Sequence, residues 1–238
     1  MKILVVADSH GNPVPLKIAK KYGKNFDKII FLGDFFDHGE EEFNVQKENF
    51  LDVMRFKREN PSQVIILIGN HDANYIVPGF YIWQPDHEKE IKKLMEKYIK
   101  EFDMAYLKGK WLFSHAGFSQ IWFKNQGFRD LTPAVISRLN TALHNMDFSY
   151  LQVCGLDPAG NDPEQNPLWI RPGSLIQCCL PGFNQVVGHT AVKEKIVKIN
   201  ENGIILFLDS EPYLRNVYGE IDTETNNFSV KEFKEIWM

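Results

Sequence analysis

Three short apolar runs rich in Ile and Val dominate the first third of the chain, and Gly, Asp or Asn follows each of them at once. The runs are Lys2–Ala7, Lys28–Leu32 and Val64–Ile68. Runs of this length that end in turn-forming residues are typical of buried strands. Between the runs lie two stretches with helical spacing of apolar residues, Val14–Tyr22 and Glu41–Arg58. The order of strand, helix and strand predicts an α/β fold with a mainly parallel sheet.

The rest of the chain adds helices and then strands. Helical spacing recurs at Asp86–Phe102 and at Pro133–Met146. After Gln185 the pattern changes to short β-type runs, at Val186, Lys195–Ile199, Ile204–Leu208 and Val217–Ile221. Asp157–Pro167, which contains Gly160 and several prolines, is predicted to be an exposed loop. No repeat or low-complexity linker divides the chain, so residues 1–238 are predicted to form a single domain.

Charge and cysteine content exclude several classes of protein. A net charge of -4 and a pI near 6.0 argue against general binding to nucleic acid or to anionic membranes. The three cysteines show no Cys-x-x-Cys spacing, which argues against a disulfide framework and against structural zinc. The apolar run before Asp8 is too short for a signal peptide, and no run is long enough to span a bilayer. We therefore expect a cytoplasmic protein.

Five polar motifs occur along the chain, nearly all of them directly after an apolar run. They are Asp8-Ser9-His10, Gly33-Asp34-Phe35-Phe36-Asp37, Gly69-Asn70-His71-Asp72, Ser114-His115-Ala116-Gly117 and Gly188-His189-Thr190. Loops that leave the carboxyl ends of neighbouring parallel strands open into one crevice, so we expect the motifs to meet there. Carboxylate, amide oxygen and imidazole ligands together suit Mn, Fe or Zn better than Mg or Ca. The motifs therefore predict a metal site.

This series of motifs resembles the calcineurin-like metallophosphoesterase superfamily, whose pattern is Asp-x-His, Gly-Asp-x-x-Asp, Gly-Asn-His-Asp/Glu, His and Gly-His. The resemblance implies a four-layer αββα sandwich, in which two mixed β-sheets are flanked by helices. It also implies two divalent metal ions, for which Mn is favoured and Fe and Zn are the alternatives. The first metal would be bound by Asp8, His10 and Asp34, and the second by Asp34, Asn70, His115 and His189. Asp34 would bridge the two ions.

The same resemblance implies a mechanism of hydrolysis. A water or hydroxide between the two metals would attack the phosphorus atom of a phosphate ester. His71 would not bind metal but would protonate the oxygen of the leaving group, with Asp37 hydrogen-bonded behind it to hold its ring. The resemblance thus implies a dinuclear-metal phosphoesterase.

The last motif indicates which branch of the superfamily the chain resembles. Many phosphodiesterases end it as Gly-His-x-His, whereas here Ala191 follows Thr190. Together with Trp169-Ile170-Arg171-Pro172, this pattern resembles the serine/threonine protein phosphatases and dinucleoside tetraphosphatases. The resemblance implies that Arg171 clamps phosphate, because a guanidinium can bind two phosphoryl oxygens at once. His38 stands where this branch has an Arg, and it is either a second substrate-binding residue or an exposed turn residue.

Several functional alternatives remain open. A phosphatase of monoesters, such as phosphoserine, phosphothreonine or small esters, is the first hypothesis. Its rivals are a dinucleoside polyphosphate hydrolase or phosphodiesterase with the same site, and a metal-free scaffold, which would have lost ligand positions that are all present here. The aromatic residues Tyr75, Phe80, Tyr81 and Trp83 are either the rim of the active-site cleft or a satellite of the core.

Overall fold

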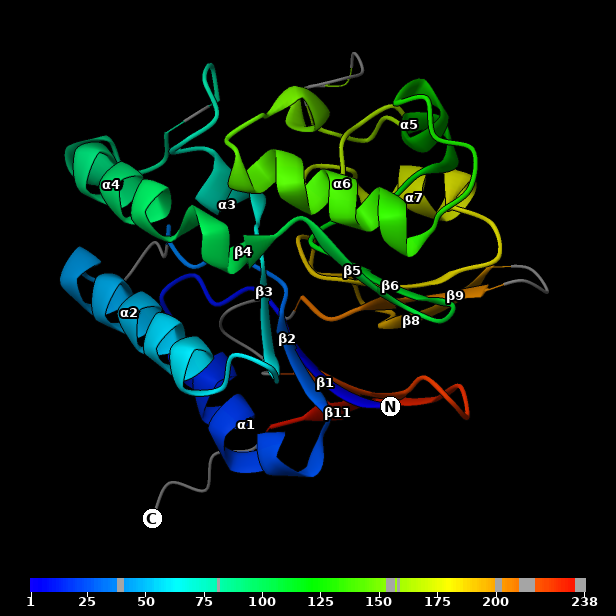
Figure 1. Cartoon of the computed structure of the whole chain (residues 1–238), viewed down its shortest axis with the longest axis horizontal. Helices are drawn as coiled ribbons and strands as arrows, with labels where there is room; N and C mark the ends of the chain where they lie inside the picture. The colour runs from blue at the N-terminus through cyan, green and yellow to red at the C-terminus, as the bar shows by residue number, and fades with distance from the viewer. Residues whose placement is uncertain are drawn as a thin grey trace.

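Two mixed β-sheets flanked by helices make up the computed structural model, which confirms the expected fold class (Figure 1). It describes residues 1–37, 41–80, 82–152, 157, 159–199, 203–209 and 217–233. His38 and Tyr81 therefore lie outside the described residues.

The first sheet has the strand order β11-β10-β1-β2-β3-β4. Its strands are β1 (Lys2–Val6), β2 (Lys28–Phe31), β3 (Val64–Leu67), β4 (Phe102–Asp103), β10 (Val217–Asp222) and β11 (Asn227–Glu232). Strands β1, β2 and β3 pair in parallel, as predicted, and β4 adds a further parallel pairing beside β3. Strands β10 and β11 join the edge beyond β1 in antiparallel pairing. The last two described strands therefore lie next to the first strand of the chain.

The second sheet has the order β5-β6-β7-β9-β8. Its strands are β5 (Ala105–Lys108), β6 (Trp111–Ser114), β7 (Asn184–Val187), β8 (Ile196–Ile199) and β9 (Gly203–Phe207). Strands β6, β7 and β9 are parallel, and the edge strands β5 and β8 are antiparallel to their neighbours. The sequence pattern placed a β-rich region in the C-terminal third, and the structure divides that region between the two sheets.

A core of aliphatic and aromatic side chains lies between the two sheets. Ile3 and Val5 of β1 face this core, where they meet Trp111, Phe113 and other residues of the second sheet. Leu4 and Val6 belong to the other large cluster, which includes buried residues of the helices. Successive side chains of a strand point to opposite faces, so a strand buried on both faces reads as a continuous apolar run. This accounts for the uninterrupted Ile and Val runs.

The helices cover the outer faces of the sheets. They are α1 (Val14–Tyr22), α2 (Phe43–Glu59), α3 (Asn70–Ala73), α4 (Glu88–Tyr98), α5 (Gln120–Asn125), α6 (Pro133–His144) and α7 (Pro172–Cys178), with 3-10 turns at Gly23–Asn25, Pro85–His87, Ile99–Glu101 and Ser149–Leu151. Helix α1 contacts β1, α2 contacts β3, and α6 contacts β4 and β5 (Figure 1). Leu175 of α7 packs against Val187 and Phe207 of the second sheet. Among the described helices, none is both long and apolar enough to cross a lipid bilayer.

Two expectations about local structure were wrong. The helix predicted to reach Phe102 ends at Tyr98, because Phe102 is fully buried and pairs with Ile66 as strand β4. Among the described residues of the stretch predicted as an exposed loop, four are buried: Gly160, Gln165, Asn166 and Pro167. The Asn166 side chain donates to the carbonyl of Leu151 at 2.9 Å, which satisfies its amide inside the protein. Long-range contacts thus override the local sequence pattern in both places.

Candidate active site

All five motifs lie at the carboxyl ends of strands that pair in parallel. Asp8 and His10 follow β1, Asp34 and Asp37 follow β2, and the third motif begins after β3 and continues into α3. His115 and His189 follow β6 and β7 of the second sheet. Four of these residues have positive φ angles: 41° at His10, 54° at Asp34, 73° at Asp37 and 66° at His189. Such backbone is uncommon outside glycine and concentrates at functional sites.

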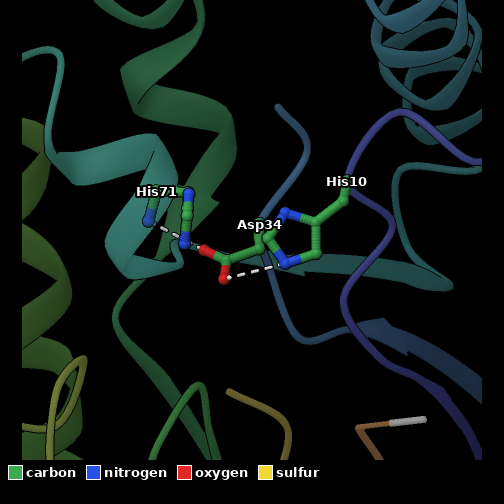
Figure 2. Close-up of side chains that lie close together, drawn as sticks. All are labelled: His10, Asp34 and His71. Carbon is green, nitrogen blue, oxygen red and sulfur yellow. Dashed lines mark hydrogen bonds and ion pairs between the residues drawn. The ribbon is translucent and has the colours of Figure 1, made fainter. Parts of the chain in front are cut away.

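The buried carboxylate of Asp34 lies at the centre of the site. Its Oδ2 atom is 3.6 Å from Nε2 of His10 and 3.3 Å from Nε2 of His115. Its Oδ1 atom accepts a hydrogen bond of 2.9 Å from the backbone N–H of His71 (Figure 2). The backbone amide fixes one oxygen, and the other oxygen lies between two imidazoles that come from different sheets.

The side chain of Asn70 lies within hydrogen-bond distance of the two histidines that follow strands of the second sheet. Its Oδ1 atom is 2.8 Å from Nε2 of His115 and 2.9 Å from Nδ1 of His189. Ligand atoms of Asp34, His115 and His189 lie within 4.8 Å of one another, and so do those of His10, Asp34 and His71. The structure therefore contains two groups that could each hold a metal ion, and they share Asp34.

Backbone carbonyls orient two of the imidazoles. Nδ1 of His10 is 2.8 Å from the carbonyl oxygen of Phe36, and Nδ1 of His115 is 2.8 Å from that of Leu32. A carbonyl only accepts, so each Nδ1 carries the proton and donates it. The Nε2 atom of each ring then faces Asp34, and it is the atom that would bind a metal ion in place of a proton.

Asp8 and His189 leave buried polar atoms without partners. Oδ2 of Asp8 accepts a hydrogen bond of 2.7 Å from the backbone N–H of His189. Among the described residues, Oδ1 of Asp8 and Nε2 of His189 have no hydrogen-bond partner although both atoms are buried. A Cβ atom on Gly188 would lie 2.0 Å from Oδ1 of Asp8, so glycine is required for this close approach. Buried unpaired acceptors are costly, and a cation would satisfy them.

The two groups differ from the expected ligand sets in two respects. Asp8, predicted as a ligand, does not belong to either group, whereas His71, predicted not to bind metal, belongs to the first. His10, Asp34, His115 and His189 fall in the groups as expected. Asn70 lies within hydrogen-bond distance of the second group.

Negative charge accumulates in this interior. Burial, with a contribution from Asp209, raises the pKa of Asp8 well above its ordinary value. Burial opposes protonation of His115, but the carboxylates of Asp34 and Asp8 outweigh it and raise the pKa of His115 to about 10. The same carboxylates would attract metal cations, and a cation bound at His115 would replace the proton on its ring.

His71 is held by a short chain of hydrogen bonds. Its Nδ1 atom is 2.9 Å from Oδ2 of Asp37, and the hydroxyl of Tyr75 donates to the other oxygen of the same carboxylate. Burial disfavours the imidazolium, but the nearby carboxylates of Asp34 and Asp37 raise the pKa of His71 above its ordinary value. The pair that the sequence predicted is thus in contact, and Tyr75 extends it.

The sequence analysis left the role of Tyr75 undecided between cleft and core. One signal could have pointed to it, because Tyr75 lies four residues after His71 and a helical turn brings residues at this spacing together. Trp83 stacks on the His71 ring, with centroids 4.9 Å apart and planes at 29°. No sequence pattern predicts that contact, because Trp83 follows an irregular segment.

Asp72 joins two of the loops that carry the site. Its buried carboxylate accepts hydrogen bonds from the backbone N–H groups of Asp34 (2.8 Å), Phe35 (2.8 Å) and Gly69 (3.0 Å). Burial, together with the nearby charge of Asp34, raises the pKa of Asp72 to about 7. The sequence analysis included Asp72 in a motif but assigned it no role, and its contacts are structural.

We expect Asp72→Ala to lower the free energy of unfolding by about 3 kcal/mol or more, because each buried N–H left unpaired costs about 1–3 kcal/mol. Urea denaturation followed by circular dichroism would measure this. Asp130→Ala is the matched control, since Asp130 is exposed, and its effect should be much smaller. Equal effects of the two substitutions would show that Asp72 does not hold the loops together.

Arg171 lies beside the last motif. Its Nη1 donates to the hydroxyl of Thr190 at 2.9 Å, and its Nε donates to the carbonyl of Ala159 at 2.9 Å. Burial lowers the pKa of the guanidinium, and the carboxylates of Asp34 and Asp209 oppose that shift. The structure thus brings Arg171 within electrostatic range of Asp34. The second candidate for substrate binding, His38, lies outside the described residues.

Known proteins share both the motifs and the fold. The profile of the family described as calcineurin-like phosphoesterase matches residues 1–192. The serine/threonine-protein phosphatase 4 catalytic subunit of Kluyveromyces lactis is 34% identical over 83 residues, which are 33% of this chain and 26% of that protein. The chain therefore matches only about a quarter of that relative's length.

Solved structures share the fold at low identity. A cold-active protein-tyrosine phosphatase of a Shewanella species superposes with a TM-score of 0.62 at 16% identity, over 98% of this chain and 80% of that one. A putative diadenosine tetraphosphatase superposes with a TM-score of 0.52 at 13% identity, over 97% and 93% of the two chains. With the family profile covering most of its length, the chain belongs to the calcineurin-like phosphoesterase family.

Proposed function

We propose that the protein is a dinuclear-metal phosphatase that hydrolyses phosphate monoesters. The observation that carries the proposal is the position of Asp34, whose Oδ2 atom lies 3.6 Å from Nε2 of His10 and 3.3 Å from Nε2 of His115. A carboxylate that faces a ligand group on each side is the arrangement by which two-metal hydrolases hold two cations about 3.5–4 Å apart. A site for a single ion would not need an oxygen shared by both groups.

The residues present fit two divalent cations, with Mn favoured and Fe and Zn as alternatives. The first ion would be held by Asp8, His10 and Asp34, and the second by Asp34, Asn70, His115 and His189. The unpaired buried atoms of Asp8 and His189 support this assignment. Bound there, the cations would lower the pKa of a water molecule and neutralise charge on the phosphoryl oxygens.

His71 would act as the general acid. Its Nδ1 atom is engaged with Asp37, so its Nε2 atom is the one that can deliver a proton to the leaving oxygen. Hydrolysis adds an oxygen from water to phosphorus and breaks the P–O bond to the leaving group. The leaving oxygen keeps the electron pair and takes the proton from His71. Asp37 and Tyr75 would keep the ring in position for this transfer.

Two features favour monoesters. The position that would carry a second histidine of the last motif is Ala191, and the segment similar to a serine/threonine phosphatase supports that branch. Arg171, anchored to Thr190, would bind the phosphoryl oxygens, with His38 as a second candidate. A dinucleoside polyphosphate hydrolase or a phosphodiesterase is the alternative. A metal-free scaffold is the least favoured reading, because every expected ligand residue is present.

We further propose that residues 1–238 form one domain and that the protein is cytoplasmic. Strands β10 and β11 lie beyond the residues matched by the family profile, yet β10 pairs with the whole length of β1. This pairing supports a single domain. Cys178 and Cys179 are both free thiols, which agrees with a reducing compartment.

Purified protein is expected to release phosphate from a phosphoserine peptide or an aryl monoester when Mn is added, and to lose this activity after chelation. Metal ions are expected to be required because they would lower the pKa of the attacking water and neutralise charge on the phosphoryl oxygens. Colorimetric phosphate release would compare these substrates with an aryl diester and a diadenosine polyphosphate. Restored activity on renewed addition of Mn is the control. Preference for the diester or the polyphosphate would select the alternative, and activity unaffected by chelation would contradict a metal mechanism.

A further inference from the structure

Trp83 is an exposed aromatic residue placed directly on the proposed general acid. Half of its surface is exposed (50%), and its ring stacks on His71 with centroids 4.9 Å apart. Its neighbours Phe80 and Ile82 are partly buried and pack against the hydrophobic core, whereas Trp83 is among the exposed large hydrophobic residues. A large exposed ring beside reactive groups is a feature of binding surfaces.

The segment that carries Trp83 is hydrogen-bonded to the pair formed by His71 and Asp37. The backbone N–H of Gln84 donates to the hydroxyl of Tyr75 at 3.1 Å, and that hydroxyl in turn donates to Asp37. The Gln84 side chain donates to Oε1 of Gln46 at 3.1 Å. Oε1 of Gln46 also accepts the backbone N–H of Asp37 at 2.9 Å. Asp37 thus anchors both His71 and the segment next to Trp83. These contacts fix the position of the Trp83 indole relative to the His71 imidazole.

On the basis of the proposed function, we infer that Trp83 forms a wall of the leaving-group subsite and selects a planar aromatic ring close to the ester oxygen. A leaving oxygen that receives a proton from His71 lies about 2.6–3.2 Å from its Nε2 atom. A ring attached to that oxygen directly, or through one carbon, reaches the indole that stacks on the same imidazole. Aromatic rings associate at centroid distances of about 4.5–7 Å. The substrate class is an aryl monoester of the phosphotyrosine kind.

The base of a nucleotide would make a poorer contact with Trp83 than an aryl ring does. The base of a nucleoside monophosphate is separated from its ester oxygen by a ribose, so it cannot reach Trp83 while the ester oxygen stays next to His71. A phosphoserine offers no ring at all. The subsite therefore distinguishes an aryl ester from both of these substrates by the distance between ring and ester oxygen.

Two phosphonates of nearly equal size test this subsite without turnover. Benzylphosphonate carries a planar ring one carbon from phosphorus, and cyclohexylmethylphosphonate carries a saturated ring in the same place. Titration calorimetry of the full-length protein with Mn is expected to show that benzylphosphonate binds about 3- to 10-fold more tightly than cyclohexylmethylphosphonate. This is the gain in affinity expected from one contact between two aromatic rings. In Trp83→Leu the two ligands should bind equally, while Trp83→Phe should keep the preference.

Phe80→Leu is the matched control, because Phe80 lies in the same segment but packs against the core. It should retain the preference of the wild type. Equal binding of the two phosphonates to the wild type, or a preference that survives in Trp83→Leu, would overturn the inference. So would an affinity for a nucleoside monophosphate that falls in Trp83→Leu while that for benzylphosphonate does not. If neither phosphonate binds, the phosphate site itself is wrong and the proposed function fails with the subsite.

Discussion

Asp34→Asn protein is expected to lose at least about 100-fold in kcat and to bind less metal than the wild type, because removing even an outer partner of a metal ligand typically costs about 10–100-fold. Oδ1 of Asp34 accepts the backbone N–H of His71, and Oδ2 faces His10 and His115. An asparagine has a single oxygen, and the His71 amide would hold it. The NH₂ group would then face the two imidazoles, and an NH₂ group has no lone pair for a cation.

Elemental analysis of the dialysed protein and a steady-state phosphatase assay would measure these two effects. Asp27→Asn is a suitable control, since Asp27 lies at the opposite end of β2 and accepts from the backbone N–H of Lys2. It should retain both metal and activity. Full metal content together with full activity in Asp34→Asn would exclude Asp34 as the bridging ligand.

His71→Ala protein is expected to lose about 10²–10⁴-fold in kcat on esters with a poor leaving group, the usual contribution of general acid catalysis. Much less should be lost on an aryl ester whose phenolate leaves without a proton. Metal content should stay unchanged, because the contact of His71 with Asp34 that orders the site uses the backbone N–H, which alanine keeps. A comparison of kcat for alkyl and nitrophenyl monoesters, with elemental analysis, measures both.

This variant also separates two readings of the first ligand group. His71 lies within 4.8 Å of the ligand atoms of His10 and Asp34, so a role as metal ligand is the alternative to a role as acid. Loss of metal with an equal loss of activity on both esters would favour the ligand. His144→Ala is the control, since the His144 ring is bound to the carbonyl of Phe102 at 2.7 Å, away from the motifs.

Strands and helices with a strong apolar pattern were predictable from the sequence. Helix α1 has the predicted bounds, Val14–Tyr22. Helix α2, predicted at Glu41–Arg58 and found at Phe43–Glu59, buries the apolar residues Phe43, Phe50, Val53 and Met54. The short helices α3, α5 and α7 were not predicted, because a segment of four to seven residues has too few turns to show a helical period. Strand β10 was expected as a strand at Val217–Ile221, but β11 was not, and the place of both strands beside β1 was not expected either.

The site also contains features that were predictable from the sequence and features that were not. The convergence of Asp34, Asn70, His115 and His189 follows from the rule that loops at the carboxyl ends of parallel strands meet, and the structure brings their ligand atoms together. The roles of Asp72 and Tyr75 depend on hydrogen bonds to residues more than 30 positions away in the sequence. Residue type alone does not specify such partners.

The sequence by itself determined which residues could carry out the proposed reaction, since the polar motifs carry their own chemistry and the apolar runs before them specify buried strands. Only the tertiary structure decided that the motifs of β1, β2 and β3 in one sheet meet those of β6 and β7 in the other. It also decided that Trp83 lies on His71. The physical reason is that strand formation depends on local spacing of side chains, whereas the packing of sheets and the path of an irregular segment depend on the burial and pairing of residues far apart in the chain.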